Sequence, residues 1–83
     1  VAAVALARGD ELMRLRDVSS ARRFYELAAS TGLPQAARAV AQTYDPQYLH
    51  RLGAAGFHGD AEQAARWYGK AAELAGRDSK PPQ

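Results

Sequence analysis

The segment from Asp60 to Gly76, "DAEQAARWYGKAAELAG", decides the fold, because an earlier segment, "DVSSARRFYELAASTG" from Asp17 to Gly32, follows the same plan 43 residues before it. Each begins with an Asp, has an alanine four residues later, and then an adjacent bulky aromatic pair. Asp is a favourable N-cap, and Gly is favourable just beyond a helix C-terminus. The sequence therefore predicts two similar helices, each ending near its glycine.

Apolar residues recur in both segments with the period of a helix, which predicts one inward and one outward face for each. In the later copy the predicted inward residues are Ala61, Ala64, Ala65, Trp67, Tyr68, Ala71, Ala72, Leu74 and Ala75, opposite Glu62, Arg66, Gly69, Lys70 and Glu73. In the earlier copy they are Val18, Ala21, Phe24, Tyr25 and Ala28, opposite Ser19, Arg22, Arg23, Glu26 and Ser30.

A partner helix is predicted before each copy, over residues 2–16 and 34–44, and Pro34 suits a first helical turn. Gly9 lies in the middle of the first of these helices, where glycine costs about 1 kcal/mol relative to alanine. Its expected use is a close approach to the facing helix. Asp45 and Pro46 predict a further short helix, "PQYLHRL", stopped by Gly53, and the glycines that follow predict a loop rich in positive φ.

The composition indicates an all-α protein, because alanine is abundant and isoleucine is absent. There is no cysteine, so no disulfide or thiolate metal site is expected and thiol usage gives no information on compartment. The longest stretch without charge, residues 27–37, is too short for the roughly 20 residues of a membrane span. The net charge of +2 argues only weakly for nucleic acid.

The spacing of Gly9, Ala21 and Ala28, together with "ARWYGKAAELAG", resembles Sel-one-like repeats of the tetratricopeptide-like superfamily. This resemblance implies two stacked antiparallel helical hairpins, an α-solenoid fragment, with a short extra helix or loop near 45–59. The implied domain covers residues 1–76, with repeat one at about 2–32, repeat two at about 34–76, and a polar proline-containing tail at 77–83. Gly53 precedes Ala64 by eleven residues rather than the expected twelve, which leaves the register of the helix broken near Asp45 open.

Since such repeats usually need about three copies to bury a continuous core, the chain is expected to be part of a longer protein or to self-associate. The resemblance also implies a non-catalytic protein-interaction scaffold whose first helices line the binding surface. The predicted partner-binding residues are Glu11, Arg14, Arg38, Gln42 and Tyr48. The alternative is a helical nucleic-acid-binding domain that presents Arg22, Arg23, Arg38 and Arg66 to phosphates.

No residue pattern indicates catalysis, a cofactor or a metal site. His50 and His58 lack the spacing that places two imidazoles on one helical face, and "GAAGFHG" lacks the lysine and hydroxyl of a phosphate loop. The pairs Arg22 with Glu26, Glu62 with Arg66 and Lys70 with Glu73 are expected to be intrahelical ion pairs on solvated faces. No targeting signal indicates a compartment.

Overall fold

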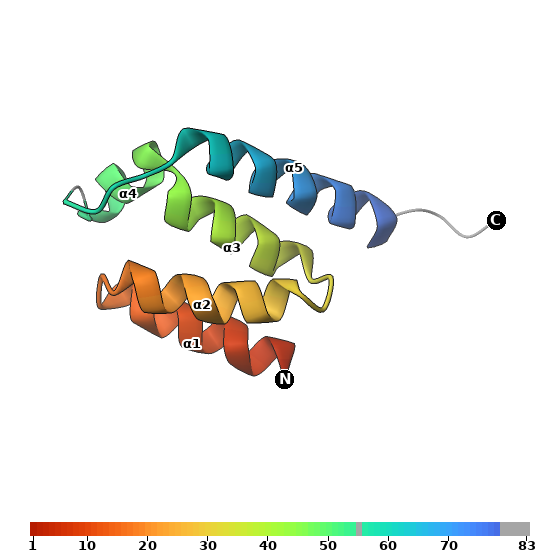
Figure 1. The fold of residues 1–83 in the computed structure, drawn as a ribbon. Helices are drawn as coiled ribbons and strands as arrows, with labels where there is room; N and C mark the ends of the chain where they lie inside the picture. The colour runs from red at the N-terminus through yellow and green to blue at the C-terminus, as the bar shows by residue number, and fades with distance from the viewer. Residues whose placement is uncertain (55, 79–83) are drawn as a thin grey trace.

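The computed structural model describes residues 1–54 and 56–78, and within these ranges the protein is all-helical without a strand (Figure 1). The predicted all-α class is therefore confirmed. The helices are α1 (Ala2–Arg14), α2 (Val18–Ala29), α3 (Pro34–Tyr44), α4 (Pro46–Leu52) and α5 (Ala61–Asp78). None of the described helices has both the length and the apolar composition needed to cross a membrane.

The four longer helices run alternately in opposite directions, with α1 at one edge and α5 at the other (Figure 1). Helix α1 packs against α2, α2 against α3, and α3 against α5, while the short α4 contacts α3. As a result, α3 is covered on two sides, whereas α1 and α5 are each covered on one. The short extra helix predicted within 45–59 is present as α4.

The core consists mostly of alanine, which lets the helix axes approach closely. Its most buried members are Val18, Ala21, Ala28, Ala36, Ala37, Val40, Ala41 and Leu49. Gly9 of α1 lies against the ring of Tyr25 of α2, since a β-carbon on residue 9 would stand 2.5 Å from Tyr25 Cε1. The Tyr25 hydroxyl donates a hydrogen bond to Asp10 Oδ1 at 2.6 Å. The prediction that Gly9 serves a close helix contact is confirmed.

The predicted helix termini are mostly confirmed. Asp17, Asp45 and Asp60 each accept a hydrogen bond from a backbone amide in the first turn of α2, α4 and α5 respectively. Gly32 and Gly53 have φ values of +88° and +87°, the left-handed region in which glycine is favoured.

Two predicted helix ends are wrong. The first helix ends at Arg14 rather than at residue 16, because Arg16 takes a φ of 65° and its guanidinium donates to the carbonyl oxygens of Met13 and Arg14. Helix α5 continues through Gly76 to Asp78, and Arg77 pairs with Glu73 at 2.7 Å in this last turn. The first two residues of the predicted tail at 77–83 are therefore helical, and the rest lie outside the described residues.

The loop between α4 and α5 follows the glycine prediction at Gly53 but not at Gly59, which does not have positive φ. The glycine at position 59 is explained instead by the lack of room for a side chain. A β-carbon there would stand 2.8 Å from both the Tyr44 carbonyl oxygen and Pro46 Cγ. The next amide, that of Asp60, donates to the same Tyr44 carbonyl, so the loop is held tightly over the junction of α3 and α4.

The inward faces are correct for most positions but wrong for the outer side of α5. Ala64 and Ala71 are buried as predicted, whereas Ala61, Ala65 and Ala72 are exposed. Tyr68, also predicted to face inward, is 37% exposed. The physical reason is that α5 is an edge helix, which among the described helices packs extensively on α3 alone, while Tyr68 reaches only Asp45 with its hydroxyl.

Arg22 was predicted to face solvent and to pair with Glu26, and this is also wrong. Its Nε donates to Thr43 Oγ1 at 2.9 Å and its Nη2 to the Thr43 carbonyl at 2.8 Å. Its guanidinium stacks 3.7 Å from the centre of the Tyr44 ring, with the Phe57 ring at 5.7 Å. Arg22 therefore joins α2 to α3 and to the loop before α5.

Candidate functional site

A hollow of about 670 Å³ lies between the C-terminal end of α2 and the side of α5. We name it the α2/α5 groove. It is lined by Ala29, Ser30 and Gly32 on one side and by Arg66, Gly69, Lys70, Glu73, Leu74 and Arg77 on the other. The two helices that form its walls are the two copies of the sequence repeat, and both pack against α3.

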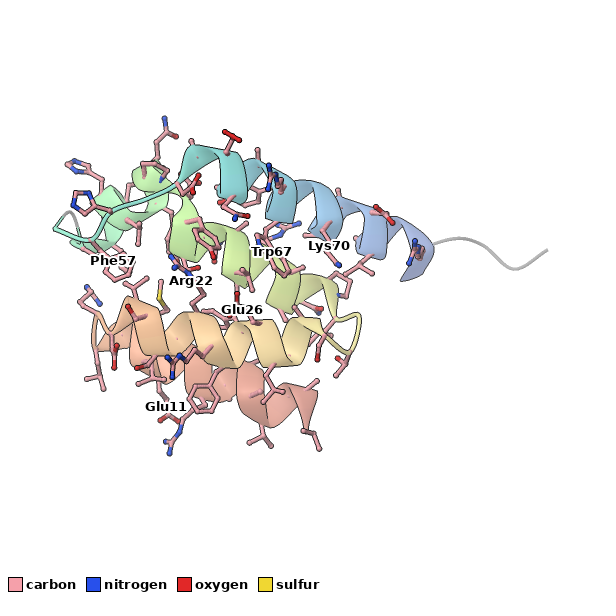
Figure 2. All side chains as sticks on the ribbon, viewed as in Figure 1. Glu11, Arg22, Glu26, Phe57, Trp67 and Lys70 are labelled. Carbon is pink, nitrogen blue, oxygen red and sulfur yellow. The ribbon has the colours of Figure 1, made fainter. Side chains whose placement is uncertain are left out.

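Trp67 and Lys70 lie on the side of α5 that faces α2, and Glu26 lies on the side of α2 that faces α5 (Figure 2). Trp67 is half-buried rather than enclosed, although it packs against the core. The Lys70 ammonium lies 5.8 Å from the centre of the Trp67 ring, within cation–π range. An apolar ring and a cation are therefore presented together beside the groove.

The charge of the groove lining is predominantly positive, with three cations and one carboxylate. Arg77 is neutralised by Glu73 at 2.7 Å, and Arg66 has a longer contact of 3.7 Å with Glu62. Among the side chains that the structure describes, those of residues 1–54 and 56–77, no carboxylate pairs with Lys70. Lys70 thus keeps its donors available to an anionic group in the groove.

Three sequence-predicted site residues lie outside this groove, on two elements. Glu11 and Arg14 are exposed on α1, where Glu11 pairs with Arg8 at 3.4 Å. Glu11 lines a different hollow, formed by α1 and α2. Tyr48 of α4 is half-buried against the core, with the Arg51 guanidinium 6.0 Å from its ring centre.

Arg38 and Gln42 are brought together, as predicted, in a hollow of about 390 Å³ between α3 and α5 that also includes Pro34, Gln35 and Ala75. Glu11 lines the separate hollow of α1 and α2, so no described hollow contains all three of these residues. That α1 and α3 line one binding surface stays a prediction, and the Arg38 and Gln42 hollow is a second candidate surface.

A polar contact joins the middle of α5 to the junction of α3 and α4. The Tyr68 hydroxyl donates to Asp45 Oδ2 at 2.7 Å, and Asp45 Oδ1 accepts from the Gln47 amide at 2.9 Å. The hydrogen bond from Tyr68 lowers the pKa of Asp45, assisted by the backbone amides of α4. Desolvation and the same hydrogen bond raise the pKa of Tyr68 to about 12.

Ser30 in the groove lining carries a hydroxyl group, which donates to the Leu27 carbonyl oxygen at 2.6 Å and not to a base that would activate it as a nucleophile. In the described part of the chain, no three His, Cys, Asp or Glu side chains gather in a way that could hold a metal ion. His50 and His58 are both exposed. The groove thus presents the Lys70 ammonium beside the Trp67 ring.

Lys70 was predicted to be an ordinary solvated residue, so the groove that it lines was not predicted. One signal was present: Lys70 follows Trp67 by three residues, a spacing that brings the two side chains together on a helix. Lys70 was instead expected to pair with Glu73, which pairs with Arg77. The expected pair of Glu62 with Arg66 is confirmed.

Comparison with known proteins adds no relative. No protein-family model matches the chain, and neither the comparison with curated proteins nor that with solved structures returns a significant match.

Proposed function

We propose that this chain is a non-catalytic interaction module that binds an acidic segment of a partner protein in the α2/α5 groove. The observation that carries the proposal is the pairing of half-buried Trp67 with Lys70, a cation to which no described carboxylate binds. A partner carboxylate at Lys70 would form a charge-assisted hydrogen bond, and an adjacent apolar residue would cover the Trp67 ring. Tryptophan is among the residues that contribute most to binding energy at interfaces.

We also propose that the four longer helices form a pair of stacked helical hairpins of the Sel-one-like kind, as the family resemblance implies. It is supported by the contact of Gly9 with Tyr25 and by the complete burial of Ala21 and Ala28, since these are the small residues on which the resemblance depends. Alternating, sequential packing of the four longer helices is also what stacked hairpins require.

The groove differs from the surface that the resemblance implies, which is lined by first helices. Here α3, the first helix of the second hairpin, packs on both α2 and α5, and the groove opens between the second helices. Arg38 and Gln42 of α3 line the smaller hollow on another side. The test below therefore compares the two surfaces directly.

Nucleic acid is the rival ligand, since phosphates would also bind Lys70. Two observations argue against nucleic-acid binding. The Arg22 guanidinium bonds to Thr43 and stacks on Tyr44, and Arg66 contacts Glu62. Two of the four arginines of the rival hypothesis are thus already engaged within the protein. The carboxylate of Glu73 in the lining would also repel a continuous phosphate backbone.

Trp67 is the sole tryptophan, so its fluorescence reports on the groove without a label. The experiment is a titration with a synthetic Glu-rich peptide that carries one leucine, compared with the same peptide with Gln at each Glu position. We expect the acidic peptide to shift the emission of Trp67 and to bind more tightly than the Gln peptide. A generic DNA duplex serves as the competitor.

Two matched variants locate the contact. Lys70→Gln should weaken binding by about tenfold, which corresponds to roughly 1.4 kcal/mol and to the loss of one charge-assisted hydrogen bond. Arg38→Gln should leave the affinity unchanged. If Arg38→Gln weakens binding and Lys70→Gln does not, the partner surface is that of α3. Tighter binding of the duplex than of the peptide would favour the nucleic-acid alternative.

A further inference from the structure

The two copies of the repeat are buried to different extents at equivalent positions. Val18, Tyr25 and Ala29 of α2 are 1%, 4% and 4% exposed. The residues 43 positions later, Ala61, Tyr68 and Ala72, are all exposed on α5. At another equivalent pair, Arg22 is half-buried and Ala65 is exposed.

The difference arises from what lies next to each helix. Helix α2 has α3 on one side and α1 on the other, whereas among the described helices α5 packs extensively on α3 alone, with one further bond from Tyr68 to Asp45 at the junction of α3 and α4. Ala61, Ala65, Tyr68 and Ala72 follow the i, i+4, i+7, i+11 spacing of a single helical face. We name these four residues the outer stripe of α5. Small side chains of this kind permit a neighbouring helix to approach closely, as Gly9 does at Tyr25.

The opposite edge of the molecule carries an apolar hollow of about 620 Å³ between α1 and α2. We name it the α1/α2 hollow. It is lined by Val1, Val4, Ala5, Ala7, Arg8, Glu11, Phe24 and Leu27. Val4 and Leu27 are 72% and 55% exposed, although both are large apolar residues.

The repeat also shows what this hollow corresponds to. Phe24 and Leu27 precede Trp67 and Lys70 by 43 residues, and the latter two face the preceding copy, α2 (Figure 2). The hollow therefore corresponds to the side of α5 that faces α2 across the α2/α5 groove, and at the first copy no described helix takes the place that α2 has there. The outer stripe of α5 includes Ala65, the counterpart of Arg22, whose guanidinium bonds to Thr43 of α3, so at this position the stripe corresponds to the side of α2 that α3 covers.

We infer that a second copy of this chain joins these two edges, with the outer stripe of α5 from one molecule seated in the α1/α2 hollow of the next. The contact would continue the packing of α2 on α3 from one molecule to another. Because the two surfaces are different, the association is head-to-tail and extends beyond a dimer unless the rotation closes a ring. Neither edge includes a residue of the α2/α5 groove lining, so this inference stands apart from the proposed function.

The test is sedimentation velocity over a concentration series up to about 1 mM, the weak end of specific association. Three variants are compared with the unmodified chain. Ala72→Glu places a charge on the outer stripe, Val4→Glu places one in the α1/α2 hollow, and Ala3→Glu places one at an exposed alanine of α1 outside the hollow. All three positions are exposed, and circular dichroism at low concentration checks that each variant is folded.

We expect the average mass of the unmodified chain and of Ala3→Glu to rise with concentration, and Ala72→Glu and Val4→Glu to remain monomeric. A mixture of Ala72→Glu with Val4→Glu retains one intact edge of each kind, so it should form one-to-one pairs and stop there. The inference is overturned if the unmodified chain stays monomeric throughout. It is equally overturned if either edge variant associates normally, or if the mixture forms no pairs.

Discussion

Tyr25 of α2 lies so close to Gly9 of α1 that a β-carbon on residue 9 would stand 2.5 Å from Tyr25 Cε1. The ring cannot move freely, because its hydroxyl is bonded to Asp10 at 2.6 Å. The desolvated hydroxyl donates to a carboxylate, and both effects raise the pKa of Tyr25. This contact fixes the separation of the two helices and, through α2, the position of the groove wall.

The first prediction concerns this glycine. Alanine favours a helix interior over glycine by about 1 kcal/mol, but at residue 9 its methyl group would collide with a fixed ring. We expect Gly9→Ala to destabilise the protein by about 1–2 kcal/mol, since overpacking outweighs the gain in helix propensity. Urea denaturation measures the change.

The matched control for this change is Gly69→Ala in α5, where a β-carbon would meet no atom within 4 Å. Without a collision, only the helix propensity remains, so this variant should be more stable by about 0.5–1 kcal/mol. Stabilisation by both substitutions would contradict the described contact of α1 with α2.

The second prediction concerns Arg22, which donates to the side chain and the backbone carbonyl of Thr43 while stacking on Tyr44. Lysine has neither the planar group nor the paired donors. We expect Arg22→Lys to cost about 1–3 kcal/mol, because one buried hydrogen-bonding arrangement is lost.

The neighbouring Arg23 is exposed, so Arg23→Lys should change stability by less than about 0.5 kcal/mol. A double-mutant cycle with Thr43→Val separates the contact from general effects. The loss of unfolding free energy on Arg22→Lys should be smaller when Thr43 is already replaced by Val. If the loss is the same in both backgrounds, the two residues are not coupled, and the described hydrogen bond between α2 and α3 is incorrect.

The third prediction is a pH dependence that arises from Asp45 and Tyr68. The lowered pKa of Asp45 means that its ionised form is favoured by folding, so this contribution is present above its ordinary pKa of 3.8 and is lost as the pH falls through the lowered value. In Tyr68→Phe the main cause of the lowered pKa is absent. Acid unfolding of this variant should therefore depend less steeply on pH below about 4.

The same contact has an alkaline consequence. The raised pKa of Tyr68 favours its neutral form in the folded state, so this contribution is full below the ordinary value of 10.0 and is lost as the pH rises through about 12. Tyrosinate absorbance measured during an alkaline titration should show this late ionisation. In Asp45→Asn the pKa of Tyr68 should move back toward 10.0. If the pKa of Tyr68 is the same in this variant, Asp45 does not accept a hydrogen bond from the Tyr68 hydroxyl.

The helices were predictable because their signals are local. Pro34 and Tyr44 bound α3 as predicted, and the Asp caps of α2, α4 and α5 were visible as single residues. The N-cap and the left-handed glycine depend on neighbours within a few positions along the chain. Where such signals occurred, as at Asp45 and Gly53, the element was found.

The groove was not predictable, because it depends on contacts between distant residues. Arg22 and Thr43 are 21 positions apart, and nothing near Arg22 in the sequence separates it from its exposed neighbour Arg23. Likewise, the apolar period predicted that Ala65 and Ala72 face inward, but periodicity cannot indicate that α5 is an edge helix. The predicted residues Glu11 and Arg38 were separated for the same reason, since their placement depends on the position of α2.

The most direct test of the proposed binding surface is a map of backbone amide chemical shifts in the full chain during titration with the Glu-rich peptide. If the peptide binds in the α2/α5 groove, we expect the shifted amides to cluster on its two walls. These are Ser30 and Gly32 on one wall and Gly69, Lys70 and Leu74 on the other. Amides of Gln35 and Arg38 should stay in place. Shifts centred on Arg38 and Gln42, or no shifts at saturating peptide, would contradict the assignment of the α2/α5 groove as the binding site.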